Sequence, residues 1–420
     1  MCLYDISKEG EFVMKFPMLR ALMVGNALEV YDFLLYSLFV SILSPLFFPS
    51  SDPLAALMMG FCVFAVGYAA RPLGAIFFGH WGDKYGRKKT LMGTLILMAV
   101  STIGIGLLPV YEKIGILAPL LLVCFRFLQG FSAGGETSGA AIFGLEHTDK
   151  TRHGFIGGLM RASTSIGTVL ATLMGLLFTN DLMPEWAWRV PFCLGGLIAF
   201  SGLYLRRALK ETIIHSPVKM PLLDVIRNYP LSFFKSVGIG GFSHVSFYVI
   251  AGYMNPTLHT KGLISSFELM MMNMIVTLVY ALLLPITGHY GDKIGLRRLM
   301  MWAALGQMAF ALPIFVVYTE GSFLGILLAQ MGLLVISGAF IAPSSAYLNT
   351  LFPPECRFSG VAIGTCLGTA LFGGTTPLIS SQLVVILGPL GPSLYLMGMA
   401  LMGLIAVGQF SGKKSVLAPT

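Results

Sequence analysis

Residues 79–88 read GHWGDKYGRK, and residues 288–297 read GHYGDKIGLR. The aspartate of the second segment follows that of the first by 209 residues, which is almost half of the 420-residue chain. A second pair has nearly the same period, because Arg152 and Arg357, each followed by glycines, are 205 residues apart. Such internal repeats are typical of transporters built from two similar halves, which hold their substrate near the middle of the membrane. A channel, or a membrane enzyme with one active site, does not need this duplication.

The composition excludes most soluble functions. Charged residues make up 11% of the chain, hydrophobic residues 56%, and the mean hydropathy is +0.81. Soluble domains carry roughly 25% charged residues, so a soluble enzyme, a nucleic-acid binder and a disordered protein are all disfavoured. The alternating strands of a membrane β-barrel would give a lower mean hydropathy. The composition therefore predicts a polytopic α-helical membrane protein.

Twelve hydrophobic spans are predicted, because about 20 apolar residues are enough to cross a bilayer. Their ranges are 17–46, 54–82, 90–110, 116–146, 152–180, 187–208, 232–258, 266–290, 298–318, 322–350, 357–386 and 390–410. With the half-length repeat, they predict an all-α membrane protein with twelve transmembrane helices in two pseudo-symmetric six-helix bundles.

The basic residues orient this topology. The two ends of the chain and the even-numbered loops hold 21 of the 27 Lys and Arg residues, whereas the opposite side holds only Lys113 and Lys261. The remaining four fall within or at the edges of spans. Because Lys and Arg accumulate in cytoplasmic loops, both termini are expected in the cytoplasm. The net charge of +8 is thus explained by topology.

The predicted segments follow from the spans and their orientation. They are a cytoplasmic N-terminus (1–16), an N-terminal bundle (17–208), a central cytoplasmic loop (209–231), a C-terminal bundle (232–410) and a cytoplasmic tail (411–420). The six cysteines are scattered and form no C-x-x-C pair, so neither a metal site nor a disulfide framework is expected.

Several further motifs resemble one family. The repeated loop resembles the loop between spans 2 and 3 of the major facilitator superfamily. Residues 25–33 (GNALEVYDF), 71–74 (RPLG), 126–136 (RFLQGFSAGGE) and 186–192 (WAWRVPF) resemble motifs of its metabolite:proton symporter family, in the same order. That family includes proline/betaine symporters and permeases for α-ketoglutarate and citrate. The resemblance implies alternating access driven by a proton gradient, with the proton as the coupling ion and no other cofactor.

Four positions depart from the family pattern. Val30 replaces an aromatic residue, Thr137 stands where the osmolyte carrier has Tyr, and Leu296 stands where Arg is expected. Arg161 occupies a position in the fifth span where relatives have an acidic or amide residue. These departures leave the fold and mechanism unchanged, and they leave the substrate open between a zwitterion such as proline or betaine and an organic acid.

Charges inside the spans are the candidates for proton coupling. An ionised side chain at the bilayer centre costs at least ~2.5–3.5 kcal/mol, which makes each one a functional-site hypothesis. The acids are Glu29, Asp32 and Glu136. Arg126 belongs to a motif that resembles one associated with proton transfer in the superfamily, and would bias a carboxylate or hold an anion. Glu29 and Asp32 lie three residues apart and share a helix face. For each acid, a structural ion pair remains the alternative to proton coupling.

Seven residues are candidates for substrate binding. Arg71 and Arg161 could hold a substrate carboxylate through two parallel hydrogen bonds, with structural ion pairing as the alternative. The full set is Asn26, Tyr31, Tyr36, Arg71, Gln129, Arg161 and His244.

The repeated loops predict a cytoplasmic gate. Its candidate residues are Asp83, Arg87, Arg152, Asp292, Arg297 and Arg357. Because helix N-termini favour anions, Asp83 is expected near Arg357 at the start of the eleventh span. By the same symmetry, Asp292 is expected near Arg152 at the start of the fifth span. A solvated loop that only sets topology is the alternative.

The function predicted from the sequence is import of a small polar metabolite by proton symport. The chain is expected to be a monomer in the bacterial cytoplasmic (inner) membrane, with the lipid bilayer and a small molecule as partners and no enzyme activity or nucleic-acid binding. Drug or metabolite efflux by proton antiport is the alternative. Drug antiporters of the superfamily carry a Gly-Pro motif in the fifth span, whereas residues 156–178 contain no proline. A sensor would need a soluble output domain, for which the 420 residues leave little room.

Overall fold

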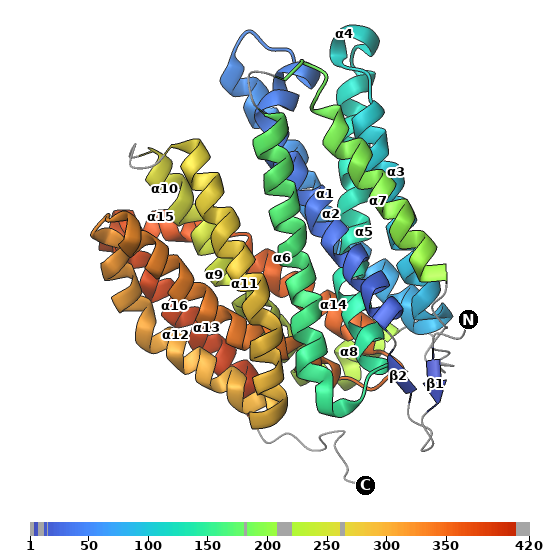
Figure 1. Cartoon of the computed structure of the whole chain (residues 1–420), viewed down its shortest axis with the longest axis vertical. Helices are drawn as coiled ribbons and strands as arrows, with labels where there is room; N and C mark the ends of the chain where they lie inside the picture. Colours follow the sequence, from blue (N-terminus) through green and yellow to red (C-terminus); the bar gives the residue numbers. More distant parts are fainter. Residues whose placement is uncertain are drawn as a thin grey trace. The chain divides into compact units, whose positions relative to one another are not determined.

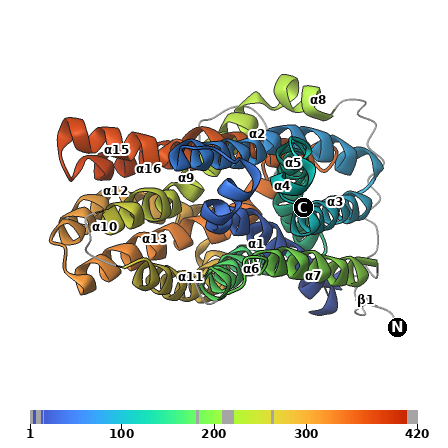
Figure 2. The ribbon, with the colours of Figure 1, turned by 90° about the horizontal axis from the view of Figure 1, so that it is seen from above.

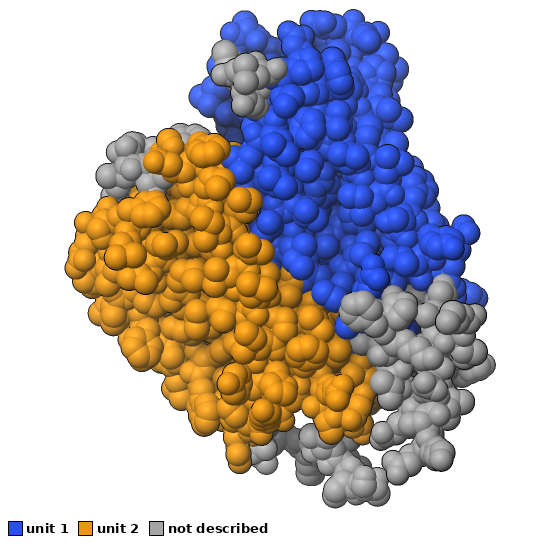
Figure 3. Space-filling model, in the orientation of Figure 1, with its two compact units in different colours: residues 1–144, 163–215 blue, residues 145–162, 216–420 orange. Residues whose placement is uncertain are grey.

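The computed structural model describes residues 4–6, 12–14, 16–179, 183–207, 221–260 and 265–408. Within these ranges the chain is almost entirely helical (Figure 1). It divides into two compact units, coloured separately in Figure 3. Unit 1 comprises residues 1–144 and 163–215, and unit 2 comprises residues 145–162 and 216–420. Residues 208–220 of the predicted bundle end and central loop, and the predicted tail 411–420, lie outside the described residues.

Unit 1 contains the helices of the first half of the chain. A short antiparallel hairpin, β1 (Tyr4–Ile6) and β2 (Phe12–Met14), precedes them. The helices are α1 (Phe16–Phe47), α2 (Pro53–Tyr85), α3 (Arg87–Leu107), α4 (Tyr111–Ile114), α5 (Leu117–Glu146), α6 (His153–Phe178) and α7 (Arg189–Arg207), with the 3-10 turn η1 (Lys150–Arg152) before α6. The end of α5, η1 and the start of α6 belong to unit 2.

Unit 2 contains the helices of the second half. They are α8 (Pro221–Asn228), α9 (Pro230–Val249), α10 (Asn255–Thr260), α11 (Ser266–Ile294), α12 (Leu296–Thr319), α13 (Phe323–Asn349), α14 (Arg357–Gly368), α15 (Thr376–Leu387) and α16 (Gly391–Val407). Two π-helical turns, η2 (Ile250–Met254) and η3 (Thr369–Gly373), interrupt the seventh and eleventh spans. Figure 2 shows α12 and α13 packed side by side.

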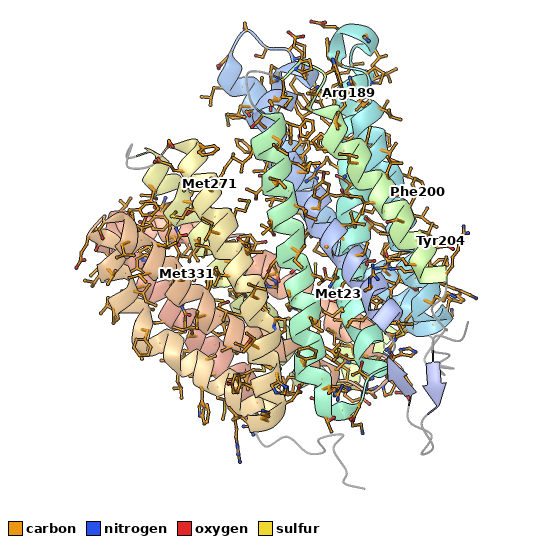
Figure 4. The ribbon with its side chains drawn as sticks, viewed as in Figure 1. Met23, Arg189, Phe200, Tyr204, Met271 and Met331 are labelled. Atoms are coloured by element: carbon orange, nitrogen blue, oxygen red, sulfur yellow. The ribbon has the colours of Figure 1, made fainter. Side chains whose placement is uncertain are left out.

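The helices match the predicted spans closely. Ten of them, among the described residues, are long and apolar enough to cross a membrane. The twelve predicted spans are completed by α16, with 17 residues, and α7, which is flanked by arginines and has 19 residues. The outer face of α7 is suited to lipid, because Phe200 and Tyr204 lie along it and are 47% and 73% exposed (Figure 4). The predicted all-α membrane architecture is therefore present.

The repeated segments make the same turn. Each ends a long helix and begins the next with one glycine between them, at Gly86 and at Gly295. These glycines have φ angles of 106° and 104°, which residues with a side chain rarely adopt. The glycines of the repeat are therefore required by the turn that joins the two spans.

Small residues bring α2 and α5 into close contact. A Cβ at Gly130 would lie 1.8 Å from the carbonyl oxygen of Gly67, and one at Gly74 would lie 1.8 Å from that of Phe131. Such contacts let two membrane helices approach at the backbone. The prediction that small residues before Glu136 bury this acid is confirmed, because Glu136 is 0% exposed.

Candidate functional site

Asp32 is a buried carboxylate with one unpaired oxygen. It lies in the middle of α1 and is 1% exposed. Its Oδ2 accepts a 2.8 Å hydrogen bond from the hydroxyl of Thr102 on α3, whereas its Oδ1 has no hydrogen-bond partner in the described part of the chain. A Cβ at Gly195 of α7 would lie 2.6 Å from Oδ1. A glycine therefore leaves room beside the unpaired oxygen.

A chain of hydrogen bonds joins Asp32 to Arg126. Gln129 donates from Nε2 to the Thr102 hydroxyl oxygen at 2.8 Å, and Arg126 donates from Nη1 to Gln129 Oε1 at 2.9 Å. Arg126 and Gln129 share a face of α5 because they are three residues apart. Two neutral side chains thus link the carboxylate to the guanidinium. A change of charge at one end of this chain alters the strength of the hydrogen bonds at the other end.

Aromatic rings surround the Arg126 guanidinium. Its Cζ lies 4.3 Å from the ring centroid of Tyr36, 4.6 Å from that of Phe33 and 5.6 Å from that of Phe64. A desolvated cation–π contact is worth about 2 kcal/mol, which offsets part of the cost of burial. Arg126 is 0% exposed, and among the described residues its Nε and Nη2 have no hydrogen-bond partner. Buried donors without an acceptor are a feature of sites that receive a ligand or water.

Glu29 and Arg71 form a second, looser pair. Arg71 Nη2 lies 3.9 Å from Glu29 Oε1, and the Thr137 hydroxyl donates to Glu29 Oε2. The Arg71 Cζ lies 3.9 Å from the ring centroid of Phe33 and 5.0 Å from that of Tyr68. Its side chain remains 22% exposed. Glu29 and Asp32 therefore share a helix face but have different hydroxyl donors and different arginines.

Glu136 has a full set of partners. Arg206 of α7 forms an ion pair with both of its oxygens, and the Thr94 hydroxyl donates to Oε2 at 2.6 Å. Arg206 also donates to the Leu91 carbonyl at 2.6 Å, and both charged side chains are 0% exposed. Arg206 is one of the 21 basic residues that the sequence places on the cytoplasmic side, and its side chain is buried. The residue lies in the last turn of α7 and turns inward, toward Gly25, where a Cβ would meet it.

The other substrate candidates of unit 1 are buried and mostly occupied. The Tyr31 hydroxyl donates to the carbonyl of Pro191 at 2.8 Å, and the Tyr36 hydroxyl donates to that of Gly60 at 3.1 Å. Asn26 is 0% exposed. The hydroxyls of the two tyrosines therefore connect α1 to neighbouring segments. Of the two rings, that of Tyr36 lies against Arg126.

Two predicted candidates lie in unit 2. Arg161 of α6 donates from Nε to the Ser345 hydroxyl of α13 at 3.3 Å. The Nδ1 of His244 on α9 lies 3.2 Å from both the Gly240 carbonyl and the Thr369 hydroxyl of η3. The sequence predicted neither set of partners.

The predicted contact of Asp292 with the start of the fifth span is present. Its Oδ1 and Oδ2 accept hydrogen bonds from the backbone amides of Gly154 and Phe155, at 2.6 and 2.8 Å. These amides open α6, where an anion is favoured. Arg297 donates to the carbonyl of Val407 at 2.9 Å.

Two further contacts involve the remaining gate candidates. Asp83 and Arg87 are both buried, with Oδ1 and Nη2 3.9 Å apart. Arg357 pairs with Glu146 at the end of α5, at 2.8 Å, a partner that the repeat did not predict. The role of these contacts in gating stays a prediction.

The site is composed of carboxylates, guanidinium groups, hydroxyls and aromatic rings. The described residues contain no group of three or more His, Cys, Asp or Glu that could hold a metal ion. Sequence reasoning missed Thr94, Thr102 and Arg206, together with the rings of Phe64 and Tyr68. The hydroxyls of Thr94 and Thr102 occur eight residues apart on α3, a spacing that puts them on one face.

Comparison with known proteins shows similarity to transporters. Residues 18–216 match the profile of a family described as "Sugar (and other) transporter". A protein of Salmonella typhimurium named proline/betaine transporter is 32% identical over 410 residues, which cover 92% of this chain and 81% of that protein. Two solved structures share the fold at low identity. The proton:xylose symporter XylE has a TM-score of 0.77 at 17% identity over 93% of this chain and 94% of its own, and the human organic anion transporter MFSD10 has 0.70 at 16% over 93% and 99%.

Proposed function

Because this chain belongs to the metabolite transporters of the major facilitator superfamily, we propose that it imports a small organic acid or zwitterion by proton symport. The chain is a multi-pass membrane protein and a secondary transporter, with a small molecule as its substrate, and it is not an enzyme. Proton coupling, the direction of transport and the substrate class are the proposed parts.

The observation that carries the proposal is that Oδ1 of the buried Asp32 has no hydrogen-bond partner in the part of the chain that the structure describes. A proton can bind to this oxygen while Oδ2 keeps its hydrogen bond from Thr102. Protonation removes the negative charge at one end of the chain that leads through Gln129 to Arg126. The positive charge of Arg126 is then no longer partly offset by the negative charge of Asp32, so Arg126 binds an anion more strongly. This is the coupling that a symporter needs, because the proton and the anionic group of the substrate favour each other's binding.

Arg126 is the proposed partner of the substrate's carboxylate. Two of its donors have no acceptor among the described residues, and Phe33, Tyr36 and Phe64 exclude water around it. Aromatic faces also attract a cationic group of the ligand, which suits a zwitterion. The named function of the Salmonella typhimurium relative, proline/betaine transport, supports this substrate class. Glu29 and Arg71, whose pair is looser and partly exposed, are proposed to line the route to Arg126.

Glu136 is proposed to be structural. Both of its oxygens are paired with Arg206, a permanently charged partner, and Thr94 adds a further donor. Releasing and rebinding a proton there would repeatedly break a buried ion pair, which costs about 3–5 kcal/mol when one partner is lost. Of the three acids inside the spans, Asp32 is therefore the proton carrier that we propose.

The remaining parts of the proposal concern topology and gating. The excess of Lys and Arg at the ends and even-numbered loops supports a bacterial inner membrane protein with both termini in the cytoplasm. The chain is proposed to work as a monomer. The contact of Asp292 with the start of α6 is proposed to hold the cytoplasmic gate and to break in each transport cycle.

Uptake by the purified full-length protein in liposomes tests this function. Proline, betaine, α-ketoglutarate and citrate are offered as labelled substrates, with and without an inward proton gradient. We expect at least one of them to accumulate above its outside concentration only when the gradient is present. Accumulation that is equal without the gradient would contradict symport, and accumulation under an outward gradient would favour antiport.

A further inference from the structure

A groove opens between the start of α6 and the end of α11, in unit 2. It has a volume of about 790 Å³. Its lining includes Arg152, Phe155, Pro285, His289 and Lys293. Arg152, Phe155 and Lys293 lie at the helix ends that carry the basic loops, which the distribution of Lys and Arg assigns to the cytoplasmic side.

The backbone contacts of the two helices fix one wall of this groove. A Cβ at Gly154 would lie 2.4 Å from the Gly288 carbonyl oxygen, and a Cβ at Gly288 would lie 2.2 Å from that of Gly154. The carboxylate of Asp292 ties the same helix start to α11 through two backbone amides. The groove is therefore a preformed feature of two tightly joined helices.

The charges at the mouth of the groove are mainly positive. Arg152 and Lys293 are exposed, and within the described ranges neither side chain makes a hydrogen bond or an ion pair. The acid that lines the groove, Asp292, already accepts two hydrogen bonds. Nearby Asp149 accepts hydrogen bonds from the hydroxyl and amide of Thr151, which lower the pKa of its carboxyl, and the charge of exposed Arg152 lowers it further. The two cations remain available to an anion.

The rest of the lining is apolar or aromatic. Pro285 and the exposed Ile286 continue from the groove along the membrane-facing part of α11. The rings of Phe155 and Tyr290 flank His289, and their centroids lie 6.5 and 6.4 Å from the centroid of the imidazole ring. A soluble anion would use only the cationic mouth. A molecule with an anionic head and an apolar tail matches both parts, and a membrane helix end lies at the depth where phosphate and acyl chain meet.

We propose that this groove binds an anionic phospholipid of the cytoplasmic leaflet, with its phosphate on Arg152 and Lys293 and an acyl chain along Ile286. The bound lipid adds a negative charge beside Asp292, at the contact proposed to hold the gate. A bound lipid therefore couples the lipid composition of the membrane to the contact between Asp292 and the start of α6.

Native mass spectrometry of the full-length protein tests the site. The protein is titrated with phosphatidylglycerol, with phosphatidylcholine and with inorganic phosphate, and the bound molecules are counted. The test variant is Arg152→Gln/Lys293→Gln. The matched control is Lys113→Gln/Arg298→Gln, which removes the same charge from exposed positions that do not line the groove. Thermal unfolding in lipid-free detergent checks that both variants are folded.

We expect phosphatidylglycerol to bind the wild type and the control alike, more tightly than phosphatidylcholine. Because each basic residue near an anionic lipid surface contributes about fivefold in affinity, the test variant should bind phosphatidylglycerol roughly 25-fold more weakly. Undiminished binding by the folded test variant, or an equal loss in the control, would overturn the proposal. Inorganic phosphate that displaces the lipid or binds as tightly would identify a soluble anion instead, and would also overturn it.

Discussion

The buried polar groups of the two units differ in kind. Every charged side chain that is fully buried, among the described residues, belongs to unit 1: Glu29, Asp32, Asp83, Arg87, Arg126, Glu136 and Arg206. The fully buried polar groups described in unit 2 are amides and hydroxyls, such as Asn255, Gln307 and Gln330. Two halves that repeat one topology therefore have different chemistry inside.

This difference bears on which unit carries proton coupling and which unit bends. Ionisable groups are costly inside a membrane protein and mark proton and ion pathways, so unit 1 is the half that we propose for coupling. Unit 2 instead contains the two π-helical turns, η2 and η3, in its seventh and eleventh spans. Such turns are frequent at functional sites and mark places where a helix bends. We infer a division of labour, with proton chemistry in unit 1 and bending in unit 2.

Removing the carboxylate of Asp32 should have the largest effect on transport. Asp32→Asn keeps the shape and the acceptor for Thr102 but cannot bind and release a proton. We expect gradient-driven accumulation to fall on the order of 100-fold or more, while exchange of labelled for unlabelled substrate continues. Uptake and exchange in the same liposomes check this. If the variant still accumulates substrate under a gradient, coupling does not depend on Asp32.

Glu136→Gln tests whether Glu136 stabilises the fold or takes part in proton coupling. The substitution leaves Arg206 buried without its anion, so we expect a loss of stability of about 3–5 kcal/mol, measured by thermal or denaturant unfolding in detergent. Glu136→Met/Arg206→Met should recover much of this loss, because a well-packed apolar pair can replace a buried ion pair. The folded fraction of Glu136→Gln should retain gradient-driven uptake. Loss of coupling in stable, folded protein would instead make Glu136 part of the proton pathway.

The twelve spans could be predicted from the sequence because a bilayer demands long apolar runs. The contact of Asp292 with the fifth span followed from the repeat. Arg206 could not be predicted to face inward. It adjoins Arg207 at a span end, where either residue could extend toward water, and only the packing of α7 decides that 206 is buried while 207 is exposed.

The surroundings of Arg126 were also beyond the sequence. Aromatic residues make up 12% of the chain, and nothing in their spacing distinguishes the rings around the guanidinium from those that face lipid. The hydroxyl of Thr102 is equally ordinary, since Ser and Thr often bond to their own helix. The link from Asp32 to Arg126 depends on three helices meeting, α1, α3 and α5, which is tertiary information.

A smaller effect on transport is expected from Asp292, near the end of α11 in unit 2. Asp292→Asn replaces a carboxylate that accepts from two backbone amides at a helix start with a neutral amide. Charge–helix interactions of this kind are worth about 1 kcal/mol, so the balance between inward-open and outward-open states should move about fivefold toward inward-open. Accessibility of engineered cysteines to a membrane-impermeant reagent measures this balance. No shift in accessibility would mean that this contact does not hold the gate.

The smallest effect should come from a neutral amide inside unit 2. Gln307 is 0% exposed, and its Nε2 and Oε1 have no hydrogen-bond partner among the described residues. Gln307→Leu removes two unsatisfied groups and should stabilise the protein by about 1 kcal/mol, with coupling unchanged. Gln330→Leu is the control, because Gln330 donates to Asn255 at 2.8 Å and its loss should destabilise. Impaired coupling in Gln307→Leu would bring unit 2 into the proton pathway.

The most direct test of the division between the two units is the exchange of protons with solution when substrate binds. The purified protein is held in weakly buffered detergent solution over a range of pH, and the pH change on adding a transported substrate is recorded for the wild type, Asp32→Asn and Glu136→Gln. Because proton and substrate favour each other's binding, the wild type and folded Glu136→Gln should take up protons, approaching one per molecule, and Asp32→Asn should take up none. Proton uptake that persists in Asp32→Asn would contradict the account.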